Sequence, residues 1–170
     1  NPEGVFAEPA HFDGGAMDVK ITRDPFEAHV GQLVLTQSAV PMPAGRFIAD
    51  GKISATPKGW RAAINMEAAE AEHDRVLSLW PLKLAPKTRA WVTERVATGT
   101  VFDARFALRL HPGEKPDVSL NYQFRDADVT VMKTLPPITG ARGYSTINNG
   151  KFTVTMDGGE TLPPQGGPIN

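Results

Sequence analysis

The sequence contains no cysteine among its 170 residues. This absence excludes disulfide bonds, a cysteine nucleophile, and zinc or iron–sulfur centres held by thiolates. A surplus of one charge sign is also lacking, because 18 Lys and Arg stand against 19 Asp and Glu, for a net charge of −1. This balance gives no electrostatic reason to expect a nucleic acid as a partner.

Long hydrophobic runs are missing as well. No apolar stretch approaches the roughly 18 residues that are typical of a transmembrane helix, so we expect any membrane anchor to lie outside this segment. The chain begins with Asn1-Pro2 rather than Met, and no signal peptide is visible. We interpret it as an excised or processed section of a longer protein.

The common catalytic motifs are absent too. The sequence has no Gly-x-Ser-x-Gly elbow, no phosphate-binding loop and no dinucleotide-binding glycine fingerprint. Its four histidines, His11, His29, His73 and His111, do not fall at metal-binding spacings, and we expect them to be solvated. We therefore predict a protein that is not an enzyme, with no catalytic residues, no metal and no cofactor.

Glycine and proline, in contrast, are abundant, with 16 and 15 residues, together well above the average share of about 12%. Between the turns that they mark, apolar residues alternate with polar ones, which is typical of strands with one apolar face. The pattern predicts four strand–turn–strand units, at about residues 15–36, 45–68, 99–126 and 143–156.

Local signals refine this outline. Apolar residues change parity at Gly31, which predicts a β-bulge, and Asn149-Gly150 predicts a tight hairpin turn. Pro86 suits the first position of a helix and Gly99 the position just beyond its end, which predicts a helix over about 86–98. Residues 70–79 have room for one or two further helical turns, and 161–170 are predicted to form a loop-like tail.

The predicted fold class is mostly β: a curved antiparallel sheet of hairpin repeats over residues 1–160, shaped as a groove or half-barrel, with one or two short helices. One short helix cannot cover about eight strands, so either the sheet closes on itself or its apolar face holds something apolar. Periodicity does not separate these two, because packed side chains and acyl chains need the same apolar face. The side chains predicted to line that face are Trp60, Ile64, Met66, Phe102, Phe106, Leu108, Leu120, Tyr122 and Phe124.

A longer pattern is more specific than any single motif. Its parts are Leu79-Trp80-Pro81, then Pro86, Arg89-Ala90-Trp91 and Gly99-Thr100-Val101, then Leu135-Pro136-Pro137 with Gly140, and finally the hairpin around Asn149-Gly150 with Asp157-Gly158-Gly159. This arrangement over roughly residues 70–160 resembles the central region of the bacterial AsmA-like proteins, the YhdP type in particular.

The resemblance implies a section of a periplasmic protein that is anchored in the inner membrane of Gram-negative bacteria. It implies an extended β-sheet with an apolar groove, associated with phospholipid movement between the inner and outer membranes and with outer-membrane integrity. The implied partners are phospholipid acyl chains and the neighbouring repeats of a longer chain. The family pattern offers no catalytic residues to carry over.

The sequence thus favours a non-enzymatic section whose apolar β groove carries or shields phospholipid. The alternative is a closed β-sandwich that serves as a structural or protein-interaction module without lipid. A hydrolase of envelope polymers is the third hypothesis, and it rests only on scattered carboxylates.

Overall fold

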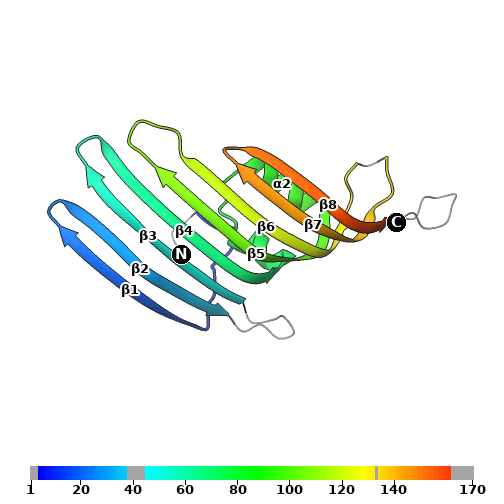
Figure 1. The fold of residues 1–170 in the computed structure, drawn as a ribbon, viewed down its shortest axis with the longest axis horizontal. Helices are drawn as coiled ribbons and strands as arrows, with labels where there is room; N and C mark the ends of the chain where they lie inside the picture. Colours follow the sequence, from blue (N-terminus) through cyan, green and yellow to red (C-terminus); the bar gives the residue numbers. More distant parts are fainter. Residues whose placement is uncertain (1–3, 38–44, 133, 162–170) are drawn as a thin grey trace.

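The computed structural model of the chain describes residues 4–37, 45–132 and 134–161. Within them, eight antiparallel strands form one open, curved sheet in which every strand pairs with its neighbours in the sequence (Figure 1). The strands are β1 (Gly14–Arg23), β2 (Phe26–Gln37), β3 (Gly45–Thr56), β4 (Gly59–Glu72), β5 (Val96–Leu110), β6 (Asp117–Val129), β7 (Ile138–Asn148) and β8 (Lys151–Thr161). The helices are α1 (His73–Leu79) and α2 (Pro86–Arg95), both between β4 and β5.

This architecture confirms the predicted fold class of a mostly β, antiparallel sheet of hairpins with short helices. The described strands belong to a single sheet, so they do not form the closed sandwich that the same alternation allows. Both helices pack on one face of the sheet, toward the end that holds β5 to β8 (Figure 1). We call the face that carries the helices the inner face and the opposite face the outer face.

The predicted β-bulge and the predicted hairpin turn are both present. In β2, the register slips at Gly31: Val30 pairs with Gly51 of β3, but Leu33 pairs with Ala49, so Val30 and Leu33 point to the same face. Asn149 and Gly150 join β7 to β8 with φ angles of 47° and 82°. Two successive positive φ angles are those of a type I′ hairpin turn.

The predicted helix boundaries need correction. The helix begins at Pro86 as expected, but it ends at Arg95 rather than near residue 98. Val96 already has an extended backbone and pairs with Val129 of β6. Gly99 therefore lies inside β5, where its lack of a side chain allows close packing, since a Cβ there would come within 3.1 Å of the Cβ of Ala127.

The predicted tail begins later in the chain than expected. Strand β8 continues past the expected end at residue 156 and includes Thr161, which pairs with Ile138. The rest of the predicted tail, 162–170, lies outside the described residues. The second short helical segment, predicted within 70–79, is present as α1, although residues 70–72 belong to β4.

The core sits between the helices and the inner face. Trp80 and Val92 pack with Ile147 of β7 in one cluster, and Phe124 with Ala141 centres a second. The Trp80 indole N–H donates to the carbonyl of Leu84 at 2.7 Å, which fixes the loop between the two helices. Helix α2 has few other apolar residues, so its place depends on this packing rather than on a broad apolar stripe.

Candidate functional site

An apolar cavity of about 350 Å³ lies between the helices and the inner face. The sheet contributes lining residues from β3 to β8, which include Phe47, Met66, Phe106, Leu120, Phe124 and Phe152. The helices and their connection contribute Val76, Leu79, Trp80, Leu84, Trp91 and Val92. The cavity is partly open to solvent, and nearly all the surface that it presents is apolar. Cavities of roughly 300–1,000 Å³ with such linings are typical of sites for small ligands.

The structure brings five of the nine predicted face residues together in this cavity. They are Met66, Phe106, Leu120, Tyr122 and Phe124. Three others share the inner face but lie outside the cavity, farther along the strands: Ile64 pairs with Leu108 across β4 and β5, and Trp60 packs edge-on against Phe26 with ring centroids 5.7 Å apart. The Trp60 side chain is 55% exposed.

Phe102 is the exception, and its predicted place on the inner face is wrong. Asp103 has a φ of 50°, and the register between β5 and β6 slips between Phe102 and Arg105. This bulge turns Phe102 to the outer face, because the alternation of faces restarts after the extra residue. Phe102 pairs with Gln123 there, and the Arg125 guanidinium lies 5.0 Å from its ring centroid.

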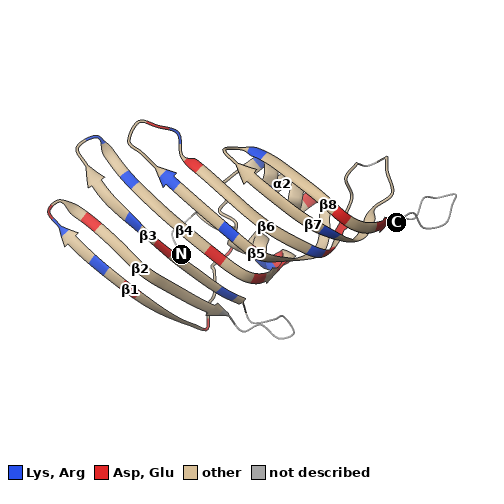
Figure 2. Cartoon of the chain, viewed as in Figure 1, with Lys and Arg blue, Asp and Glu red and all other residues tan. Residues whose placement is uncertain are grey.

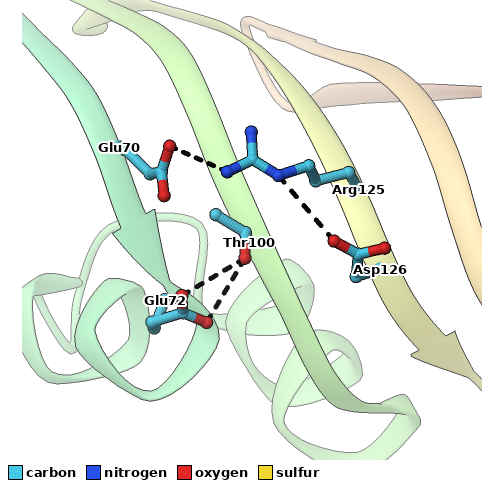
Figure 3. A network of polar contacts seen from close by, with 5 residues as sticks. All are labelled: Glu70, Glu72, Thr100, Arg125 and Asp126. Atoms are coloured by element: carbon cyan, nitrogen blue, oxygen red, sulfur yellow. Dashed lines mark hydrogen bonds and ion pairs between the residues drawn. The ribbon is translucent and has the colours of Figure 1, made fainter. Parts of the chain in front are cut away.

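The outer face near Phe102 carries a polar network (Figure 3). Arg125 of β6 donates to the Glu70 carboxylate of β4 at 2.9 Å and lies 3.8 Å from the Asp126 carboxylate. The Thr100 hydroxyl donates to the Glu72 carboxylate at 3.3 Å. The hydrogen bond to Glu70 raises the pKa of Arg125. The Arg125 contacts connect β4 and β6 on the outer face, and Thr100, which also lines the cavity, connects β5 to β4 through Glu72. We interpret these contacts as links between strands.

Charges elsewhere on the sheet are mixed. Basic and acidic side chains are interspersed along the strands, without a broad region of one sign in this view (Figure 2). Among the described residues, no group of three or more His, Asp or Glu is placed to hold a metal ion. No helix in the described part of the chain has the length and apolar character needed to cross a bilayer.

Sequence reasoning missed several residues of the cavity. His73, at the start of α1, was expected to be solvated, but it lines the cavity and is half-buried. This burial lowers the pKa of the imidazole, and Asp74 opposes the shift. Trp91 lies against Phe152, with ring centroids 6.0 Å apart. Phe6 also lines the cavity. The sequence predicts Trp91 as a plug or packing residue of the helix rather than as part of the apolar face. Nothing local marks Phe6, because it reaches the site from a segment far away in the sequence.

Tyr122 is the one predicted residue with a titratable group in the cavity wall. Burial raises the pKa of its phenol, and a side-chain hydrogen bond with Ser145 acts in the opposite direction. The phenol is therefore neutral at physiological pH and adds no charge to the cavity wall.

Comparison of the chain with protein-family models, curated proteins and solved structures finds no match.

Proposed function

We propose that this chain is a non-enzymatic section of a longer envelope protein and that its cavity holds a phospholipid acyl chain. The observation that carries the proposal is the apolar cavity of about 350 Å³ between the helices and the inner face. Protein interiors are close-packed, and voids larger than a water molecule are few. A cavity of this size and lining therefore favours an apolar occupant.

The energetics suit an acyl chain. Each methylene removed from water contributes about 0.8 kcal/mol, and the aromatic and aliphatic walls give no preference for one methylene over the next. Such a lining holds a chain without fixing its position along the cavity. The role that follows is to carry or shield phospholipid between the inner and outer membranes and so to support outer-membrane integrity, in a periplasmic protein of the AsmA-like type.

The edges of the sheet support the proposed neighbours. Strands β1 and β8 lie at opposite ends of the sheet, and among the described residues each pairs on one side only (Figure 1). Unpaired edges are templates for further strands. Because the sheet has an even number of strands, a following section in the same orientation places its first strand antiparallel to β8. We propose the preceding and following repeats of a longer chain as the partners of these edges, with the membrane anchor beyond them.

Two phenylalanines of β5 provide the test. The Phe106→Ser variant removes a wall of the cavity, whereas Phe102→Ser makes the same change four residues away on the outer face. Binding of a fluorescent fatty acid to the purified chain, and extraction of co-purified phospholipid for mass spectrometry, are the two measurements. We expect Phe106→Ser to weaken probe binding about tenfold or more, since part of the apolar contact is lost, and Phe102→Ser to bind as the parent does.

Two results would contradict the proposal. One is a folded parent chain that carries no phospholipid and binds no acyl probe, which would favour the structural or protein-interaction module. The other is an equal loss of binding in both variants, which would place the bound probe outside the cavity.

A further inference from the structure

Residues 4–13, which we call the N-terminal segment, connect the two sides of the cavity. At one end, the carbonyl of Val5 accepts a hydrogen bond from the backbone N–H of Leu82 at 2.8 Å, in the connection between α1 and α2. At the other end, the N–H of Asp13 donates to the carbonyl of Thr36 of β2 at 2.9 Å. The segment therefore extends from the helices to the part of the sheet that the helices leave uncovered.

Two aromatic side chains of this segment lie at the cavity. Phe6 is part of its lining. Phe12 packs edge-on against Phe47, another lining residue, with ring centroids 5.9 Å apart and planes at 82°. The segment thus contributes apolar surface of its own to a site that otherwise belongs to the sheet and the helices.

Arg75 of α1 contacts the segment near its C-terminal end. Its guanidinium lies 5.4 Å from the centroid of the Phe12 ring and donates to the carbonyl of His11 at 2.8 Å. A cation over an aromatic face contributes about 0.5–1 kcal/mol at exposed sites. The contact is therefore real but weak compared with the packing of a strand in a sheet.

The segment is attached near its two ends and is exposed between them. Its residues belong to no helix or strand, and Ala7, Glu8 and Pro9 are exposed. Segments with few buried contacts and without ladder hydrogen bonds open at low free energy. The sheet and helices beneath have separate hydrogen bonds and core clusters, so displacing the segment leaves them in place.

We propose that the N-terminal segment is a displaceable cover: its Phe6 narrows the partly open cavity, and an apolar ligand enters faster when the segment moves aside. Phe6 then acts as an internal competitor of the ligand, and Phe12 with Arg75 fixes the closed position. The identity of the ligand as an acyl chain rests on the proposed function, but the covering role does not.

Cysteine labelling tests the cover without any lipid. The chain has no cysteine, so Ala104→Cys places a single thiol in the cavity wall. Ala107→Cys, in the same strand, is the matched control, because Ala107 pairs with Asn65 and Ser119 on the outer face. The rate of maleimide labelling is measured in each background with and without Phe6→Ser, and Glu8→Gln serves as the control within the segment.

We expect Phe6→Ser to raise the labelling rate of the thiol at position 104 about tenfold and to leave the rate at position 107 unchanged. Glu8→Gln should change neither rate. Equal labelling at position 104 with and without Phe6→Ser overturns the proposal. If Phe6→Ser unfolds the chain, both thiols react faster, and Phe12→Ala, which loosens the segment without altering the lining, then decides by the same comparison.

Uptake of a fluorescent fatty acid by the same variants separates the two proposals. Faster uptake in Phe6→Ser supports both. Faster labelling without any uptake keeps the cover and overturns the lipid-carrying function. Uptake at the same rate in parent and variants, with unchanged labelling, keeps the lipid function and overturns the cover.

Discussion

The two ends of the sheet are built from the same kind of strand but differ in what covers them. At the β1 end, the inner-face side chains Met17 and Ile21 are 62% and 61% exposed. At the β7 end, Ala141 is 0% exposed and belongs to a core cluster that packs against Trp91 of α2. The difference comes from the two helices and the N-terminal segment, which cover only part of one face. Alternation thus creates an apolar face, and the inserted elements decide where it becomes a core.

The largest expected effect is the difference in stability between variants of two tryptophans, one in the covered part of the sheet and one in the uncovered part. Trp80 is 9% exposed and donates to Leu84, whereas Trp60 lies on the uncovered part of the inner face. We expect Trp80→Ala to lower the free energy of unfolding by about 3–5 kcal/mol, as for a core aromatic residue, and Trp60→Ala by less than about 1 kcal/mol. Urea unfolding followed by circular dichroism measures both. Similar losses in the two variants would mean that the uncovered half is packed as tightly as the covered one.

A smaller effect is expected at the exposed edge. Exposed apolar residues on an unpaired strand favour pairing between copies, and a lysine on the edge opposes it. We expect the parent chain to self-associate as its concentration rises, and Ile21→Lys in β1 to raise the dissociation constant about tenfold, or ~1.4 kcal/mol. Sedimentation velocity over a range of concentrations gives the constant.

The control for this experiment is Ile53→Lys, which adds the same charge to an exposed inner-face position of the interior strand β3. It should associate as the parent does if the edge of the sheet makes the contact. Equal weakening in both variants would instead assign self-association to the apolar face. A parent that stays monomeric at every concentration would show that the edges do not pair between copies.

The smallest effect concerns pH. Burial lowers the pKa of His73 below its ordinary value of 6.5, so the unfolded chain binds more protons than the folded chain as the pH falls through that value. The free energy of unfolding should therefore decrease below about pH 6.5. In His73→Gln the decrease in the free energy of unfolding should be smaller. In His29→Gln, a change at an exposed position, the decrease should be the same as in the parent chain. Urea midpoints at pH 7.5, 6.5 and 5.5 test the difference, and identical pH profiles in both variants would exclude His73 as its source.

The sequence was sufficient for the strands and hairpins because their signals are local. The bulge at Gly31 was predictable, since the apolar residues visibly change parity there. The bulge at Asp103 was not, because Phe102, Phe106 and Leu108 keep an unbroken parity in the sequence, while the backbone turns Phe102 alone to the outer face. A glycine often marks a backbone position with a positive φ angle, but the residue with the positive φ angle in this bulge is an aspartate.

The candidate site was only partly predictable for a different physical reason. Met66, Phe106 and Leu120 follow from strand alternation, but Phe6 reaches the cavity from a segment that is distant in the sequence. Helix α2 has too narrow an apolar stripe to indicate which strands it covers. The cavity is thus a property of how the helices pack on the sheet, and no single segment encodes it.

The sequential order of the strands has a kinetic consequence. Every ladder joins strands that are neighbours in the chain, so each pairing closes a short loop, except across the helical connection between β4 and β5. Short loops carry a small closure entropy, and isolated hairpins form within about 1–10 μs. We expect the two-residue turn at Asn149-Gly150 to be among the earliest nuclei and the sheet to assemble by addition of hairpins, with the joining of β4 to β5 as the slow step that completes both the sheet and the walls of its cavity.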